Sequence, residues 1–358
     1  AGIADAVVSL PRSRAPRRAL SITSIVIFAL LGALGVNGDF GQYPTLASVL
    51  GISSIPDLPT SLVKAQRAAA GSASATVLPL WQTWHAPADL PKRGVVGAIT
   101  ITAAVSHFHA RRALVYLPPA ALVPNPPALP VLVMLSGQPG SPENIFISGH
   151  LNTIADRIAA ANNGLAPIVV VPDQLTAPGV NPMCVDSKIG NSATYLTVDV
   201  PNWIRANLNV QSATQSWGIG GFSQGGTCAV QLGAGHPEIF GSILDISGEL
   251  EPKVGSLEET IARGFAGDAA AYDRAKPLSI LAANSPYRNT VGVFAAGSLD
   301  SKYTPWIATV SAAASAAGIR TTVFSSPGTA HDWYTVRYVL AKGLPVLYSQ
   351  MGLMRPAS

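Results

Sequence analysis

A serine flanked by glycines is the strongest chemical signal in this chain. Residues 220–226 read Gly-Gly-Phe-Ser-Gln-Gly-Gly, which places Ser223 at the centre of a Gly-x-Ser-x-Gly core. This spacing is typical of a sharp strand-to-helix turn, in which the serine is strained and the flanking glycines let strand and helix pack closely. Such a serine is a nucleophile for acyl transfer. Because the chain contains 33 glycines, the motif needs support from its context.

That context includes a histidine and an acid later in the chain. In known enzymes with such a turn, the acid and then the histidine follow the serine along the sequence. His331 comes just after a predicted strand at 320–325, and Asp300 comes just after a predicted strand at 291–295. We therefore expect His331 to be the general base and Asp300 to be the acid that orients its imidazole.

Three other acidic residues compete for the role of Asp300. Asp245 ends the strand after the nucleophile helix, Glu249 lies in the following loop, and Asp332 adjoins His331. Asp300 is favoured because it follows a late strand, as the order of such triads requires. The histidines at 107, 109, 150 and 236 precede the late strands and are expected to be structural or surface residues.

Two backbone N–H groups are needed to bind the oxyanion that forms when the serine attacks. Gln224 follows the nucleophile and begins the predicted helix, where the helix dipole adds to its N–H. The loop 136–140 follows an apolar strand and reads Ser-Gly-Gln-Pro-Gly. Because Pro139 has no N–H, Gln138 is the second candidate.

Alternating strands and helices must position these residues. The apolar runs and their spacing predict a mostly parallel sheet with helices on both faces. The first two strands alternate in the manner of an antiparallel pair. The predicted strands are 95–105, 113–117, 131–135, 168–171, 217–220, 242–246, 291–295 and 320–325, and the predicted helices are 151–161, 196–208, 224–233 and 303–317.

The N-terminal part has a different composition. Residues 1–18 form a basic tail, and residues 19–36 form an uncharged apolar run that is long enough to span a bilayer. We interpret this run as a transmembrane helix or signal anchor in preference to a cleaved secretory signal, and the preceding arginines predict that the rest of the chain is exported. Residues 37–92 are a predicted linker with a short helix, and residues 93–358 are the predicted catalytic domain. Within this domain, the segment 248–286 is expected to include a lid or cap.

Composition and cysteine count exclude several other classes. Only 12% of the 358 residues are charged, and the net charge of +4 comes partly from the tail, so no basic stripe indicates nucleic-acid binding. Neither cysteine has a histidine or a second cysteine at ligand spacing, so neither a metal nor a cofactor is expected. Cys184 and Cys228 either pair in an oxidising compartment or remain two buried thiols; the disulfide is favoured.

Several motifs together resemble the esterase D and mycolyltransferase superfamily of α/β-hydrolases. They are Leu-Ser-Gly-Gln at 135–138, Glu-Asn-Ile-Phe at 143–146, the Gly-Phe-Ser-Gln-Gly turn, His-Pro-Glu-Ile-Phe at 236–240 and Ala-His-Asp-Trp at 330–333. The segment 36–45 resembles actinobacterial membrane-anchored esterases of this superfamily. The resemblance implies a serine esterase with an α/β-hydrolase fold, or an acyltransferase. Mycolyltransferases typically carry glutamate as the acid, so Asp300 matches the esterase side.

The expected partners follow from these features. They are an ester or lipid substrate of the cell envelope, and the membrane through the N-terminal helix.

Two other function classes have weaker support from the sequence. A dinucleotide-binding oxidoreductase would explain Gly-x-Gly at 218–220 but would leave Asp300 and His331 without a role. An inactive hydrolase fold that serves as a surface binding protein is disfavoured because every triad position is filled.

Overall fold

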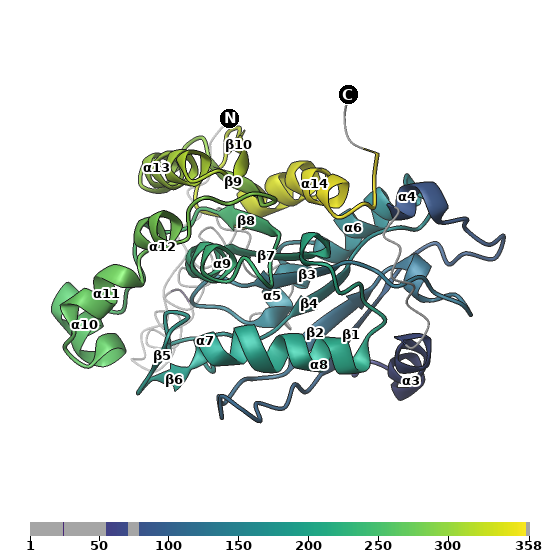
Figure 1. The fold of residues 1–358 in the computed structure, drawn as a ribbon, viewed down its shortest axis with the longest axis horizontal. Helices are drawn as coiled ribbons and strands as arrows, with labels where there is room; N and C mark the ends of the chain where they lie inside the picture. Colours follow the sequence, from purple (N-terminus) through teal and green to yellow (C-terminus); the bar gives the residue numbers. More distant parts are fainter. Residues whose placement is uncertain (1–23, 25–54, 71–78, 356–358) are drawn as a thin grey trace, which may run out of the picture.

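A large mixed sheet organises the computed structural model, which describes residue 24 and residues 55–70 and 79–355 (Figure 1). The described part of the chain contains eight strands in this sheet. In spatial order they are β1 (Val95–Ile99), β2 (Ala113–Leu117), β4 (Ile168–Val171), β3 (Val131–Leu135), β7 (Trp217–Phe222), β8 (Ser242–Ile246), β9 (Val291–Gly297) and β10 (Arg320–Ser326). A short hairpin of β5 (Asp186–Ser187) and β6 (Gly190–Asn191) lies apart from it.

The strands run parallel from β4 to β10, whereas β1 and β2 pair antiparallel with each other and β2 pairs antiparallel with β4. The predicted fold class, a mostly parallel α/β sheet, is confirmed. The prediction that the first strand extends to Val105 is wrong. Ile99 already pairs with Ala113, the first residue of β2, so the chain beyond Ile99 has no strand partner.

Helices connect the strands. They are α3 (Thr60–Ala69), α4 (Leu80–Thr83), α5 (Pro142–Ile147), α6 (Leu151–Ala160), α7 (Ser192–Thr194), α8 (Val200–Asn207), α9 (Gln224–Gly235), α10 (Leu257–Phe265), α11 (Ala269–Arg274), α12 (Pro277–Ala283), α13 (Tyr303–Ala316) and α14 (Trp333–Gln350). Short helical turns are η2 (Pro119–Ala121), η3 (Tyr195–Asp199, a π-helical turn) and η4 (Thr214–Ser216).

The two faces of the sheet follow from the alternation of side chains along its strands. On β8, Ile243 lies in an apolar cluster with residues of α9, α12 and α13, while Leu244 lies in the larger cluster that includes α14. On β9, Phe294 and Val293 divide in the same way. Helices therefore cover both faces, as the near-continuous apolar strands predicted.

The long final helix α14 is the largest element that the sequence did not predict. It contains Gly343 and Pro345, which act as helix breakers in a sequence pattern. In the fold, Gly343 lets the helix approach the sheet, because a β-carbon there would lie 3.0 Å from a side-chain carbon of Val293. Tertiary packing on the sheet therefore overrides the weak local propensity.

The helix predicted at 196–208 begins earlier than expected and is not a regular α-helix throughout. It is one continuous helical stretch that begins at Ser192, has a π-helical turn over η3 and continues as α8 to Asn207. Pro201 lies in the first turn of α8. Since proline has no N–H to bond the carbonyl four residues earlier, the regular α-helical ladder is interrupted at this point.

Parts of the predicted linker pack on the domain. The Gln66 side chain is buried in α3 and donates to the carbonyl of Ala121, and the N–H of Leu58 donates to the carbonyl of Ala98 in β1. The predicted membrane segment 19–36 falls outside the described residues except for residue 24. Within the described ranges, none of the helices is both long and apolar enough to cross a bilayer.

Candidate active site

Ser223 lies at the turn between β7 and α9. Its backbone φ of 57° and ψ of −120° are strained for a residue with a side chain, and its N–H donates to the carbonyl of Ile246 at 2.8 Å. The flanking glycines are required by space. A β-carbon on Gly221 would lie 2.2 Å from the carbonyl oxygen of Gly225, and one on Gly225 would lie 2.4 Å from that of Ser136. The turn is therefore the tight strand-to-helix turn expected from the sequence.

The structure brings His331 and Asp300 to this serine. Ser223 Oγ lies 2.9 Å from His331 Nε2, and His331 Nδ1 lies 3.2 Å from Asp300 Oδ2. Asp300 follows β9, and His331 lies between β10 and α14. All three residues follow the carboxyl ends of parallel strands, the edge where ligands bind in such sheets. Three side chains that can act as a nucleophile, a base and an acid thus lie in one hydrogen-bonded chain.

The surroundings of His331 favour its neutral form. Burial lowers the pKa of His331, while the neighbouring carboxylate of Asp300 acts in the opposite direction. Phe222 contributes to this burial, since its ring centroid lies 4.8 Å from that of the imidazole. A neutral imidazole is what a general base requires before the reaction.

The competing acids have other roles. Asp332 caps α14 by accepting from the N–H of Thr335 at 2.8 Å, and it also accepts from the N–H of Ala330. Asp245 is fully buried and accepts from the N–H of Gly248 at 2.9 Å; burial raises its pKa to about 7. Burial also raises the pKa of Glu249. The acid that accepts a hydrogen bond from His331 Nδ1–H is Asp300.

The two glutamines predicted for the oxyanion site lie beside Ser223. Gln224 begins α9, so its N–H has no acceptor within the helix. The loop that carries Gln138 lies against the nucleophile, because a β-carbon on Gly137 would be 3.3 Å from the Cβ of Ser223. The peptide bond between Gln138 and Pro139 is cis. Both segments are therefore close enough to face a substrate on Ser223.

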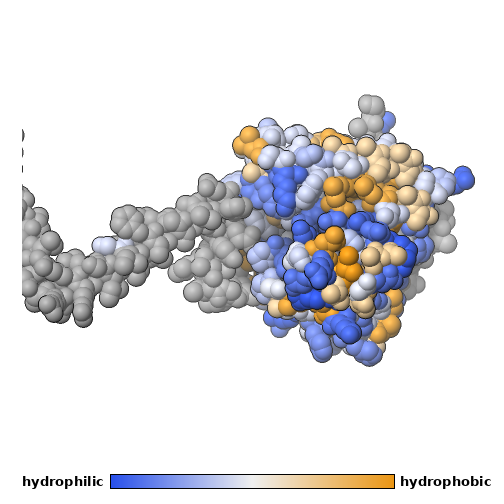
Figure 2. All heavy atoms as spheres, turned by 90° about the vertical axis from the view of Figure 1, so that its left-hand side faces the viewer, coloured by the Kyte–Doolittle hydropathy of each residue, from blue (hydrophilic) through white to orange (hydrophobic). Residues whose placement is uncertain are grey.

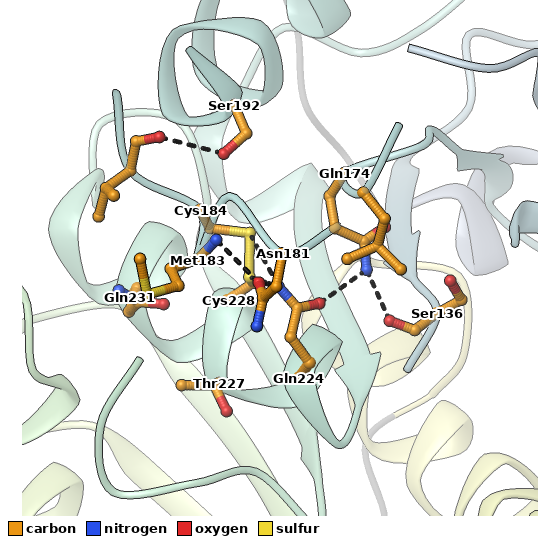
Figure 3. Close-up of a disulfide and its surroundings, with 12 residues drawn as sticks. Ser136, Gln174, Asn181, Met183, Cys184, Ser192, Gln224, Thr227, Cys228 and Gln231 are labelled. Atoms are coloured by element: carbon orange, nitrogen blue, oxygen red, sulfur yellow. Dashed lines mark hydrogen bonds between the residues drawn. A yellow bond between two sulfur atoms is a disulfide. The ribbon is translucent and has the colours of Figure 1, made fainter. Parts of the chain in front are cut away.

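A polar network holds the side chain of Gln224 (Figure 3). Its Oε1 accepts from Nε2 of Gln174 at 3.0 Å, and its Nε2 donates to Oδ1 of Asn181 at 3.0 Å. Its Nε2 also lies 3.2 Å from Sγ of Cys228. Cys228 forms a disulfide with Cys184, so the covalent link joins α9 to the loop that supplies Asn181. The network fixes the first residue of the nucleophile helix.

Replacing both cysteines by alanine is expected to lower the free energy of unfolding by about 3–4 kcal/mol, because the disulfide closes a loop with a sequence separation of 44 residues. Urea unfolding of the oxidised protein and of the double variant measures the difference. A reducing agent should destabilise the unsubstituted protein and leave the double variant unchanged. Equal unfolding midpoints for the two oxidised proteins would contradict the expectation.

The segment between β8 and β9 contains the helices α10, α11 and α12. Its early part contacts the disulfide loop, since the side chain of Asn181 donates to the carbonyl of Lys253. Figure 2 views this side of the molecule and shows apolar residues gathered among hydrophilic ones. Leu257 at the start of α10 is 55% exposed. The sequence predicted a lid or cap here but not its helices.

Two groups at the site escaped the sequence-based prediction. Phe222 was seen only as part of the motif, and Tyr303 only as the first residue of a helix, yet both rings contact His331. The position of Tyr303, three residues after the predicted acid, was the available signal. Among the described residues, no cluster of histidine, cysteine or acidic side chains is arranged to hold a metal ion.

Comparison with known proteins identifies a matching family model and a related protein. A family model described as "Putative esterase" matches residues 108–336. An uncharacterized protein of Corynebacterium glutamicum is 32% identical over 346 residues, which cover 95% of this chain and 78% of the relative.

Solved structures share the fold at lower identity. An S-formylglutathione hydrolase from Agrobacterium tumefaciens is 20% identical with a TM-score of 0.59, and the match covers 73% of this chain and 97% of that one. A ferulic acid esterase is 19% identical with a TM-score of 0.61, over 74% and 100% of the two chains. FphF, a fluorophosphonate-binding serine hydrolase of Staphylococcus aureus, is 14% identical with a TM-score of 0.55, over 71% and 98%.

Proposed function

The chain belongs to the esterase family of α/β-hydrolases, which are carboxylic ester hydrolases, and from this premise we propose that it cleaves its ester through an acyl-enzyme on Ser223. The observation that carries the proposal is the hydrogen-bonded chain from Ser223 through His331 to Asp300, with distances of 2.9 and 3.2 Å. The same three residues were selected from the sequence by their order and their strands.

In the proposed mechanism, His331 Nε2 takes the proton of Ser223 as the serine oxygen attacks the ester carbonyl. The Asp300 carboxylate accepts from Nδ1–H, which fixes the tautomer and stabilises the imidazolium. The N–H groups of Gln138 and Gln224 bind the oxyanion. The imidazolium then gives its proton to the leaving alcohol, and a water activated by the same histidine hydrolyses the acyl-enzyme.

We further propose that the substrate is a lipid or another ester of the cell envelope and that the enzyme acts outside the cytoplasm. The basic tail followed by the apolar run at 19–36 supports membrane anchoring with export of the catalytic part. The disulfide between Cys184 and Cys228 also supports an oxidising compartment. We also propose that α10, α11 and α12 form a cap over the site and that its shape determines the acyl-chain length of the substrate.

A panel of p-nitrophenyl esters with short and long acyl chains tests this function. We expect release of the free acid, together with labelling of the protein by a fluorophosphonate probe. The panel is repeated with trehalose as an acceptor alcohol. Accumulation of acyl-trehalose in place of free acid would assign an acyltransferase. Absence of both turnover and labelling would overturn the proposal and leave an inactive surface binding protein.

A further inference from the structure

The imidazole of His331 lies against two aromatic rings that come from different elements. The ring of Phe222, the last residue of β7, has its centroid 4.8 Å away at an interplanar angle of 30°. The ring of Tyr303, the first residue of α13, stacks more closely, with a centroid distance of 3.9 Å and an angle of 21°. The close, nearly parallel contact is therefore the one with Tyr303.

The hydroxyl of Tyr303 reaches one further group of the site. It donates to Oε1 of Glu249 at 3.5 Å. Glu249 lies in the loop after β8 and is fixed there, because its N–H donates to Oγ1 of Thr227 in α9 at 2.9 Å. The Tyr303 hydroxyl is thus held by the loop after β8, which carries neither Asp300 nor His331.

We propose that Tyr303 is a positioning residue for the general base His331. The stacked ring of Tyr303 keeps the imidazole aligned with Ser223, while Glu249 holds the Tyr303 hydroxyl. This inference rests on the proposed role of His331. The mechanism described above assigns no task to either Tyr303 or Glu249.

Two hydrogen bonds alone do not fix the tilt of the His331 imidazole ring. His331 is held at Nδ1 by Asp300 and at Nε2 by Ser223. Both bonds lie close to the plane of the ring, so the ring remains free to tilt about the line through its two nitrogens. A stacked ring at 3.9 Å opposes this tilt.

Charged groups around the imidazole also act on the pKa of His331 and therefore on the pH dependence of activity. Asp300 and Asp332 favour the imidazolium, while Lys302, beside Tyr303 in sequence, disfavours it. Glu249 faces the imidazole only through Tyr303. Replacing Tyr303 alters none of these residues themselves, but it removes the ring beneath Lys302 and, in the leucine and phenylalanine variants, the hydroxyl that contacts Glu249. The loss of ring cover is then the main change at the imidazole, and added water raises the pKa of His331 toward its ordinary value.

The test compares Tyr303→Phe with Tyr303→Leu through the pH dependence of kcat/KM on p-nitrophenyl acetate. The phenylalanine variant keeps the ring. The acidic limb of its pH profile, where kcat/KM falls as the pH decreases, should therefore coincide with that of the unsubstituted protein, and its kcat should fall by less than about tenfold. The leucine variant should lose about tenfold to a hundredfold in kcat, and its acidic limb should move to higher pH. Circular dichroism and thermal melting verify that both variants fold.

Two controls make the result specific. Trp306→Leu removes an aromatic ring one turn further along α13, where it packs on Tyr303, and its acidic limb should not move. Glu249→Gln combined with Tyr303→Phe should cost less than the sum of the two single changes, because both act through one hydroxyl contact. An unshifted acidic limb in Tyr303→Leu would overturn the inference, as would equal losses in the leucine and phenylalanine variants.

Failure of this inference is distinguishable from failure of the proposed function. Fluorophosphonate labelling that persists in Ser223→Ala would overturn the nucleophile assignment whatever Tyr303 does. Labelling that depends on Ser223, together with a Tyr303→Leu variant that behaves as the unsubstituted protein does, would overturn the role of Tyr303 alone.

Discussion

Replacement of Ser223 by alanine is expected to lower kcat for p-nitrophenyl esters by about four to six orders of magnitude and to abolish fluorophosphonate labelling. The reason is that Ser223 Oγ is the atom placed 2.9 Å from the proposed base His331, in a turn with a strained backbone at the end of β7. Without this oxygen no acyl-enzyme forms, and the oxyanion site and substrate binding supply only the residual rate. Steady-state kinetics and gel-based probe labelling measure both effects.

Ser247→Ala is a matched control for this change. Ser247 follows the neighbouring strand β8 and has a similar positive φ of 51°, and its buried hydroxyl has no hydrogen-bond partner among the residues that the structure describes. Loss of that hydroxyl should leave both kcat and labelling close to those of the unsubstituted protein. Labelling of the Ser223→Ala variant at full strength would remove Ser223 from its proposed role.

Asp300→Asn is expected to lower kcat by about 10³–10⁴-fold with little change in the fold. The asparagine has a similar shape, but its amide group donates a hydrogen bond where Nδ1–H of His331 needs an acceptor. The imidazole then takes the wrong tautomer, and Nε2 no longer accepts the proton of Ser223. Measurement of kcat across the pH range separates this loss from a simple shift of the acidic limb.

The control for the acid is Asp245→Asn. Asp245 is buried behind the nucleophile helix, and an asparagine oxygen can still accept the hydrogen bond from Gly248. Its kcat should stay within about tenfold of the unsubstituted protein, a change of about 1.4 kcal/mol at most. If Asp245→Asn removed activity and Asp300→Asn did not, Asp245 would be the acid of the triad.

The strands of the core could be predicted because their residues satisfy local and global requirements together. The predicted strands at 113–117, 131–135 and 242–246 match β2, β3 and β8 at both ends. Helix α14 could not be predicted, since Gly343 and Pro345 oppose a helix locally and only packing on the sheet stabilises it. The cap helices α10–α12 were likewise expected only as a lid, because their apolar residues find partners that are distant in sequence.

The sequence by itself determined which side chains have the chemistry for acyl transfer and in what order they follow the strands. The glycines around Ser223 require a tight turn, and the positions of Asp300 and His331 after late strands place them at one edge of a parallel sheet. Only the tertiary structure decided which acid meets His331, how the disulfide loop supports Gln224, and that Tyr303 stacks on the imidazole. The reason is physical: order along the chain limits the edge on which residues gather, whereas contacts of a few ångströms depend on how separate elements pack against each other.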